Sequence, residues 1–326
     1  MMAGARERSP WAWVPSLYFA EGIPYVVVMT VSVIMYKRLG VSNTEIALYT
    51  SWLYLPWVIK PLWSPLVDIL KTKRHWIVMM QLLVGAGLAG VALTLPLDNY
   101  LRYSLAFLWL LAFSSATHDI AADGFYMLGL SQHQQAWFVG VRSTFYRLAM
   151  ITGQGLLVML AGFVEEATGD VTLAWTITFY VLSGLFVLFF LYHQVVLPRP
   201  TSDSPREHGG IGDIFSEFGR TFVSFFKKEH IAAALAFLLL FRFAEAQLAK
   251  MASPFLLDAA EAGGLGLSTS QVGFVYGTVG VLMLTLGGIL GGFLAARHGL
   301  RYWLWWMVAA INLPNAVYIF LATVQP

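Results

Sequence analysis

The chain has 326 residues, of which 58% are hydrophobic and only 12% are charged. Soluble globular domains carry about 25% charged residues, so this composition excludes a soluble enzyme, a nucleic-acid-binding protein and a disordered protein. It indicates a polytopic, all-α membrane protein. Cysteine is absent, which excludes disulfides, thiolate nucleophiles and cysteine-ligated metals. A net charge of +2 is too small to argue for a polyanionic partner.

Nine segments are candidates for membrane helices, which need about 20 mostly apolar residues. They cover residues 11–38, 43–70, 75–97, 102–130, 136–164, 171–197, 229–257, 269–296 and 301–324. If the N-terminus is cytoplasmic, nearly all loop Lys and Arg residues lie inside, and only Lys37, Arg38 and Arg102 lie outside. The positive-inside rule therefore predicts a cytoplasmic N-terminus.

The long polar stretch at residues 198–228 separates the first six segments from the last three. It begins with the Pro- and Ser-rich composition of a linker. Residues 211–226 then repeat Ile and Phe at helical spacing, which predicts an amphipathic helix in the membrane interface. The chain thus divides into an N-terminal six-helix half (1–197), a cytoplasmic linker (198–228) and an incomplete C-terminal half (229–326).

An internal repeat supports this division. The tripeptide Phe-Ala-Glu occurs at 19–21 and again at 243–245, and Ser-x-x-Glu/Gln capping boxes open the second and eighth segments at 42–45 and 268–271. Six helices, a linker and a second helix set in the same direction are typical of the major facilitator fold, in which two six-helix halves surround a central site. The repeat offset predicts a C-terminally truncated chain with nine of the twelve helices.

The loops after the second and eighth segments carry a degenerate gating motif. Asp68 and Arg74 belong to the first copy, and Arg297 and Arg301 belong to the second. The second loop resembles the G-x-L-x-D-R-x-G-R signature of the superfamily, with Ala296 in place of the acid. The alternative is that these charges are ordinary positive-inside loop residues.

Charged residues also fall inside the predicted spans, where an unpaired charge costs about 2.5–3.5 kcal/mol. They are Glu21, Lys60, Asp119, Asp123, Arg142, Arg147, Arg242, Glu245 and Lys250. Their combined cost would exceed the stability of a typical domain. We therefore expect them to pair with one another or to face water.

The deepest charges are candidates for substrate binding and proton coupling. Glu21, Lys60 and Arg147 lie about 15 Å from the predicted helix ends, close to the middle of a core about 30 Å thick. They suit an anionic substrate and a titratable acid, and Glu21 is the better proton carrier because burial disfavours its charged form. Arg242 and Glu245 are three residues apart on one helix and are expected to neutralise each other.

Two ion pairs are predicted between the fourth and fifth segments, which are antiparallel neighbours in sequence. Equal depth places Asp119 opposite Arg147 and Asp123 opposite Arg142, and the two acids share one helix face. A purely structural role, in which the pairs hold helices together, is the alternative, above all for Asp123 and Arg142.

Four segments carry a more specific pattern. Residues 115–124 read S-A-T-H-D-I-A-A-D-G, residues 146–150 read Y-R-L-A-M, residues 60–68 read K-P-L-W-S-P-L-V-D and residues 18–25 read Y-F-A-E-G-I-P-Y. Together these segments resemble AmpG-type muropeptide permeases, whose patterns are S-A-T-Q-D-I-x-x-D-A, Y-R-L-G-M and K-x-L-W-[AS]-P-L-x-D. The opening segment is common to a wider group of peptide, acetyl-CoA and drug transporters. His118 and Gly124 depart from the pattern, where Gln and Ala are usual.

The resemblance implies a proton-driven permease of the bacterial inner membrane that imports anhydro-muropeptides for cell-wall recycling. Its partners would be an anionic small molecule, protons and the bilayer, with no cofactor and no nucleic acid, and the protein would be a monomer. A related transporter for another organic anion, such as acetyl-CoA or a peptide, is the alternative. A membrane-embedded acyltransferase is hinted at only by His118-Asp119, and nothing positive points to a non-transporting sensor. We expect no catalytic or metal-binding residues.

Overall fold

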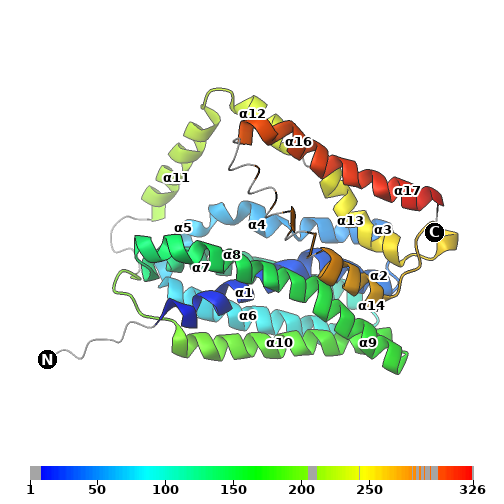
Figure 1. Ribbon diagram of the computed structural model, residues 1–326. Helices are drawn as coiled ribbons and strands as arrows, with labels where there is room; N and C mark the ends of the chain where they lie inside the picture. The colour runs from blue at the N-terminus through cyan, green and yellow to red at the C-terminus, as the bar shows by residue number, and fades with distance from the viewer. Residues whose placement is uncertain are drawn as a thin grey trace.

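The computed structural model describes residues 9–204, 211–241, 243–280 and 300–324, with positions 282, 283, 286, 287, 290 and 294. The regular elements of this part of the chain are helices (Figure 1). By length and composition, seven of them could cross a membrane: Pro10–Arg38, Lys73–Thr94, Tyr100–Gly129, Gln132–Thr168, Val171–Val196, Ile231–Leu257 and Tyr302–Val324. The expected eighth span at 269–296 lies partly outside the described residues.

The first two predicted spans are built differently. The first is continuous and consists of η1 (Pro10–Ala12), α1 (Val14–Val26), a π-helical turn η2 (Val27–Val31) and α2 (Ser32–Arg38). The second, expected at 43–70, is a series of short helices: α3 (Asn43–Trp52), α4 (Leu55–Ile59), η3 (Lys60–Leu62) and α5 (Ser64–Leu70). Pro56, Pro61 and Pro65 each stand at the first or second position of a new helix. Proline lacks the N–H that a continuing helix needs, so the single long helix expected there does not form.

The rest of the N-terminal half is regular. Its helices are α6 (Lys73–Thr94), α7 (Tyr100–Gly129), α8 (Gln132–Ile151), η4 (Thr152–Leu157), α9 (Val158–Thr168) and α10 (Val171–Val196). Side-chain oxygens cap three of them, since Thr72, Ser131 and Asp170 accept hydrogen bonds from free N–H groups of α6, α8 and α10. Gly169, at φ 69°, ends α9 in the left-handed conformation that glycine adopts without strain.

The C-terminal part continues with helices after the loop at 197–204. They are α11 (Ile211–Phe226), α12 (Ile231–Phe241), α13 (Phe243–Leu257), η5 (Ala260–Ala262), α14 (Thr269–Phe274), η6 (Val275–Val279), α16 (Leu300–Asn312), η7 (Leu313–Asn315) and α17 (Ala316–Val324). Ser268 and Gln271 form the predicted capping box of α14. Ser42 caps α3 as predicted, although its hydroxyl also donates to the Glu45 carboxylate.

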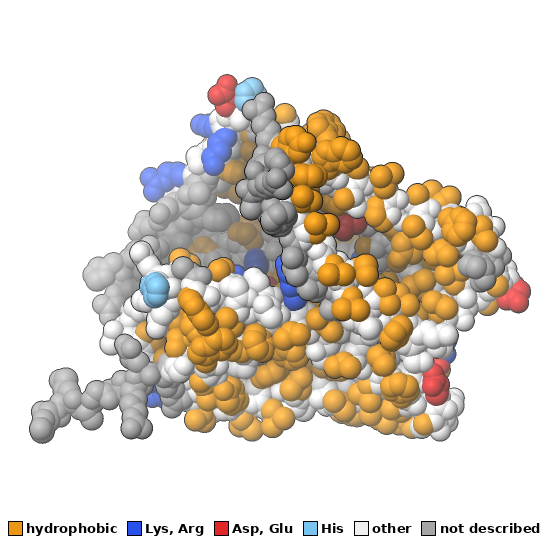
Figure 2. All heavy atoms as spheres, viewed as in Figure 1, with side chains coloured by type: hydrophobic (Ala, Val, Ile, Leu, Met, Phe, Trp, Pro, Cys, Tyr) orange, Lys and Arg blue, Asp and Glu red, His pale blue; other side chains and the backbone are white. Residues whose placement is uncertain are grey.

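The helices form two arms that converge at one end of the molecule. The first arm contains the helices up to α10, of which α1, α6, α7, α8 and α10 run side by side in Figure 1, and the second arm contains the helices from α11 onward, including α12, α16 and α17. The end with the N-terminus and the loops at 71–72, 130–131 and 197–204 is called the N-terminal face. The opposite face carries the loops at 39–42, 95–99, 169–170 and 258–268. Hydrophobic side chains cover much of the outer surface (Figure 2), as expected where lipid replaces water.

Candidate functional site

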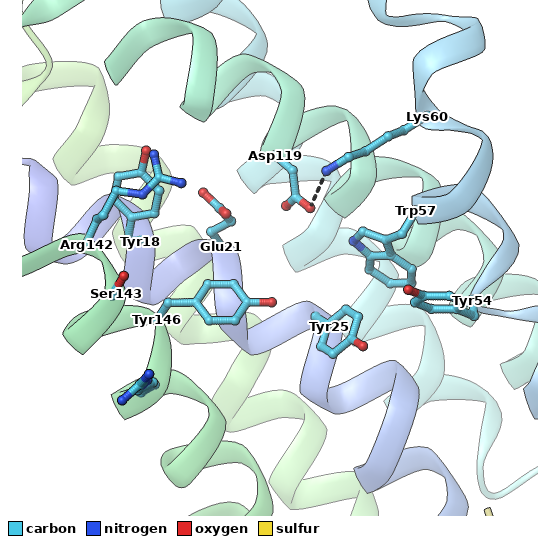
Figure 3. Close-up of a pocket in the computed structure, with 11 residues that line it drawn as sticks. Tyr18, Glu21, Tyr25, Tyr54, Trp57, Lys60, Asp119, Arg142, Ser143 and Tyr146 are labelled. Atoms are coloured by element: carbon cyan, nitrogen blue, oxygen red, sulfur yellow. Dashed lines mark hydrogen bonds and ion pairs between the residues drawn. The ribbon is translucent and has the colours of Figure 1, made fainter. Parts of the chain in front are cut away.

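A cavity of about 520 Å³ lies among α1, the broken segment α3–η3, α7 and α8 (Figure 3). Its lining residues are Tyr18, Glu21, Tyr25, Tyr54, Trp57, Lys60, Asp119, Arg142, Ser143, Tyr146 and Arg147. Five of the residues predicted from the sequence are therefore brought together in one place. The cavity has the size of a small-molecule site, and its polar groups converge from helices that are far apart in the sequence.

Two buried acids define the polar side of the cavity. Glu21 on α1 is 8% exposed and Asp119 on α7 is 9% exposed. Glu21 Oε2 and Asp119 Oδ1 accept no hydrogen bond from the described residues. Figure 3 shows both carboxyl groups directed into the cavity. A buried carboxylate oxygen without a donor is costly, so each acid is suited to take up a proton or to receive a donor from a ligand.

Lys60 supplies the cation that faces Asp119. Its Nζ lies 3.4 Å from Asp119 Oδ2, and it stands where α4 gives way to η3. The predicted pairing of Asp119 with Arg147 is therefore wrong. The prediction assumed that α7 and α8 are packed neighbours, whereas α8 packs chiefly against α1 and the broken segment α4–α5 packs against α7.

The second predicted pair is confirmed. Arg142 Nη2 lies 3.1 Å from Asp123 Oδ1, and the Tyr18 hydroxyl donates to the same oxygen at 3.1 Å. The Arg142 guanidinium also stacks over the Tyr18 and Tyr126 rings, 4.7 and 5.2 Å from their centroids. These cation–π contacts hold Arg142 at the edge of the cavity. Asp123 itself lies just outside the lining.

Arg147 differs from the other two cations of the cavity. It lines the cavity and its side chain is exposed. Within the described part of the chain it forms no ion pair at 4.0 Å or less, whereas Lys60 and Arg142 each have a carboxylate partner. A ligand anion could therefore reach Arg147 without displacing a protein carboxylate.

The other predicted intramembrane charges lie elsewhere. Glu245 on α13 does not line this cavity, and Arg242 is outside the described residues. Lys250, also on α13, donates to the Thr50 carbonyl at 3.4 Å, which joins the two arms. The predicted neutralisation of Arg242 by Glu245 stays a prediction.

Asp68 and Arg74, the residues of the predicted gating motif in the first half, lie at the N-terminal face. Asp68 at the end of α5 forms an ion pair with Lys73 in the first turn of α6. Arg74 donates to two carbonyls at the end of α10, those of Gln194 and Leu197. In the second half, Arg297 and the side chain of Arg301 are outside the described residues.

Asp203 is a residue of this face that the sequence analysis missed. Its two carboxylate oxygens accept from the backbone N–H groups of Lys73 and Arg74, at 2.7 and 3.0 Å. Ser202 donates to the Leu128 carbonyl at 3.3 Å. The beginning of the predicted linker is therefore fastened to the first turn of α6, where a carboxylate is favourable. Asp203 was counted with the linker because its partners are about 130 residues away.

At the opposite face, Lys37 at the end of α2 ties the two arms together. Lys37 forms an ion pair with Asp258, and Asn43 donates to the other oxygen of Asp258 at 2.9 Å. Burial raises the pKa of Asp258. The hydrogen bonds from Lys37 and Asn43, with the charge of Lys37, outweigh burial and hold that pKa below its ordinary value.

A second group of bonds at the opposite face surrounds the end of α9. Arg38 forms an ion pair with Glu165. Thr269 donates to Glu165 at 3.2 Å, and Ser270 donates to Glu166 at 2.5 Å. The N-terminus of α14 is thereby fixed to the end of α9.

Glycines bring the same two segments close together. A Cβ placed on Gly155 would lie 2.6 Å from the Gly277 Cα, and one on Gly162 would lie 2.7 Å from the Ser270 nitrogen. Only glycine allows this approach, as in other closely packed membrane helices. Among the described residues, contacts between the arms concentrate at this face, and α11 against α5 is the exception.

Aromatic side chains complete the cavity, and the sequence analysis did not name them. The Tyr25 ring lies edge-to-face against Trp57, with centroids 5.3 Å apart, and Tyr54 lies beside it. Tyr146 points into the cavity from α8 (Figure 3). A signal for them exists in helical spacing, since Tyr25 is four residues from Glu21 and Trp57 is three from Lys60.

His118 does not line the cavity. It is 2% exposed and its ring contacts the Gln81 amide at 3.1 Å. The side chain is therefore a buried packing and hydrogen-bonding group. This removes the one sequence feature that hinted at a membrane-embedded acyltransferase.

Comparison with known proteins identifies the family and several relatives of this chain. Residues 16–326 match the family model described as Major Facilitator Superfamily. The protein named AmpG 4 of Rickettsia conorii is 26% identical over 87% of this chain and 67% of its own length. The anhydromuropeptide permease of Escherichia coli K12 is 25% identical over 87% of this chain and 55% of its own length.

A solved structure shares the fold. It is a bacterial homologue of the human lysosomal transporter Spinster, in an inward-facing and unoccupied conformation. The TM-score is 0.68 at 16% identity, and the match covers 92% of this chain and 64% of that one. The chain thus spans between about half and two thirds of the length of these proteins.

Proposed function

This chain belongs to the major facilitator superfamily, a family of multi-pass membrane transporters and not of enzymes, and from that premise we propose that it imports anhydromuropeptides together with protons. The observation that carries the proposal is the cavity in which Glu21, Asp119, Lys60 and Arg147 meet. The name of the Escherichia coli relative, anhydromuropeptide permease, supports the substrate class.

The cavity offers an anionic, bulky substrate two kinds of contact. Arg147 is available to a carboxylate, and its planar guanidinium can bind both oxygens at once. The rings of Tyr25, Tyr54 and Trp57, packed edge-to-face, give an aromatic wall on the other side, where the face of a sugar ring can pack. A few placed charges among aromatic side chains are the usual composition of a small-molecule site.

Proton coupling follows from the exchange of partners at Lys60. A substrate carboxylate that binds Lys60 displaces Asp119, whose carboxylate is then buried without a counter-charge. Because such a group is costly, Asp119 takes up a proton. One negative charge and one positive charge therefore enter the cavity together. Glu21, buried beside it with an unpaired oxygen, is the second acid that can carry the proton.

The direction of access follows from the contacts between the arms. Bonds at the opposite face close that side, and the positive-inside rule assigns the N-terminal face to the cytoplasm. The described state is then the one from which substrate leaves into the cytoplasm. We assign the protein to the bacterial inner membrane because the relatives named above are bacterial, with residues 1–197 and 229–326 as its two transporter halves and residues 198–228 as the linker.

Uptake by proteoliposomes tests the proposal. Labelled anhydromuropeptide should accumulate when an inward proton gradient is imposed, and a protonophore should abolish the accumulation. Glu21→Gln and Arg147→Ala should each reduce uptake at least about tenfold, a loss of about 1.4 kcal/mol. Arg102→Ala is the matched control, because Arg102 is exposed near the opposite face.

Two results would contradict the proposal. Uptake that does not depend on the proton gradient would contradict proton coupling. Uptake that is unchanged in both cavity variants would contradict the assignment of the binding site. A panel with free peptide and acetyl-CoA decides the substrate class, since preference for either one would replace the muropeptide assignment.

A further inference from the structure

Outside the cavity, four polar side chains from four helices form one hydrogen-bonded network, and three of them, Gln81, His118 and His193, are buried. The Ser16 hydroxyl on α1 lies 2.9 Å from His193 Nε2 on α10. His193 Nδ1 lies 3.0 Å from Gln81 Oε1 on α6, and Gln81 Nε2 lies 3.1 Å from His118 Nε2 on α7. Transport as proposed above uses none of these four residues.

Burial orders this hydrogen-bonded network. Gln81 and His193 are 0% exposed, so their polar atoms depend on one another. Each neutral imidazole has one donor and one acceptor, and the amide supplies both kinds. The Gln81 amide oxygen can only accept and its nitrogen can only donate, so His193 Nδ1 donates to Gln81 and Gln81 Nε2 donates to His118 Nε2. With Nδ1 protonated, a neutral His193 accepts at Nε2 from the Ser16 hydroxyl. A buried hydrogen-bonded network of this kind favours one arrangement of its helices.

The two ends of the network lie on the same helices as the two cavity acids. His118 directly precedes Asp119 on α7, and Ser16 is about one and a half turns before Glu21 on α1. We propose that Ser16, His193, Gln81 and His118 form a positioning network that fixes the rotation of α1 and α7 and so holds the two cavity carboxyl groups in place.

A small rotation is enough to matter. A side-chain group lies about 5–6 Å from its helix axis, so a turn of about 20° moves it by about 2 Å. The Lys60–Asp119 separation is 3.4 Å, and a shift of that size breaks the ion pair. The charged groups that face the two acids are Lys60, Asp123 and Arg142, so any rotation changes the charge environment of both.

The test uses variants that open the network and variants that spare it. Gln81→Met removes both bonds of the amide at nearly constant volume, and His118→Leu removes the α7 end. His118→Gln keeps a hydrogen-bonding group there. Ser183→Ala is the matched control, because Ser183 Oγ donates to the Gly85 carbonyl at 2.9 Å between the same α10 and α6 without joining the network.

The first readout needs no transported substrate. Infrared spectra of the full chain in bilayers are recorded against pH, and the Asp119 carboxyl band is assigned by its loss in Asp119→Asn. In Gln81→Met and His118→Leu the titration midpoint of that band should move by about one pH unit. In His118→Gln and Ser183→Ala it should stay at the wild-type value. If Gln81→Met does not fold, the two His118 variants decide the matter.

Two outcomes overturn the proposal. An unchanged midpoint in folded His118→Leu would show a merely structural network. An equal shift in Ser183→Ala would show a general loosening of α6 and α10. The second readout rests on the proposed function: the pH profile of anhydromuropeptide uptake should shift in the same variants. Absence of uptake in the wild type would count against the transport proposal, while the infrared result would still decide the positioning network.

Discussion

Asp258→Asn should weaken the contacts that hold the two arms together at the opposite face. Asp258 follows α13 and receives Lys37 from the end of α2 and Asn43 from the start of α3. The substitution removes the negative charge and leaves a side chain of nearly the same size. The Lys37 ammonium then loses its carboxylate partner, while the backbone and its packing are unaltered.

The size of the effect follows from the burial of the pair. The side chains of Lys37 and Asp258 are 17% and 19% exposed, so solvent screens the pair in part. Hydrogen bonds to charged groups are worth about 1.5–3 kcal/mol each, and we discount the two together to about 1–3 kcal/mol. A free-energy change of this size corresponds to a change of about 5–150-fold in an equilibrium constant, so the fraction of molecules with this face open should rise by that factor.

Spin labels can report this opening because the chain contains no cysteine. Thr44→Cys and Glu261→Cys place labels on exposed positions of the two arms at the opposite face. Double electron–electron resonance in bilayers should give a narrow distance distribution in the parent. In Asp258→Asn a second, longer population should be present.

The pH dependence gives an independent check. Hydrogen bonds from Lys37 and Asn43 outweigh burial and hold the folded pKa of Asp258 below its ordinary 3.8. A depressed pKa contributes stability above the ordinary value that is lost as pH falls through the folded value. The parent distribution should therefore stay narrow from neutral pH to about pH 4 and broaden only in stronger acid.

Asp98→Asn is the control, because Asp98 is an exposed acid on a loop of the same face. It should leave the distribution unchanged. The reasoning is refuted if Asp258→Asn retains the parent distribution, or if Asp98→Asn broadens it to the same degree.

Three further predictions follow from the described contacts. Lys60→Met should reduce substrate binding at least about tenfold, and it should lower the melting temperature because Asp119 is left buried without its cation. Adding Asp119→Asn to this variant should restore the melting temperature but not substrate binding. Gly155→Val should widen the spin-label distances, because its side chain meets the backbone of α14–η6, whereas Gly140→Val, with nothing within 4 Å of its Cβ, should not. Asp203→Ala should cost about 1 kcal/mol of capping energy and speed protease cleavage in the loop at 197–204.

Much of the fold could be predicted from local properties of the sequence. Apolar runs of sufficient length identify membrane helices because lipid leaves backbone groups no partner except their own helix. The Ser268 capping box is equally local, since its partners are three residues apart. The Asp123–Arg142 pair was predictable from equal depth on consecutive segments. The broken second span was the exception, and its three prolines determined where the short helices begin.

Apart from Asp123 and Arg142, only the tertiary structure decided which charges meet. Lys60 and Asp119 are 59 positions apart, and Lys37 and Asp258 more than 200. Their contacts depend on which helix faces which and on how each is rotated about its axis. Hydropathy leaves the rotation of each helix about its axis undetermined, because it depends on the amino-acid composition of the segment. Rotating the helix by a fraction of a turn does not change that composition. By itself the sequence therefore determined the membrane helices and the charges that needed partners. Packing of α8 on α1 and of α7 on the broken segment decided the partners and the cavity between them.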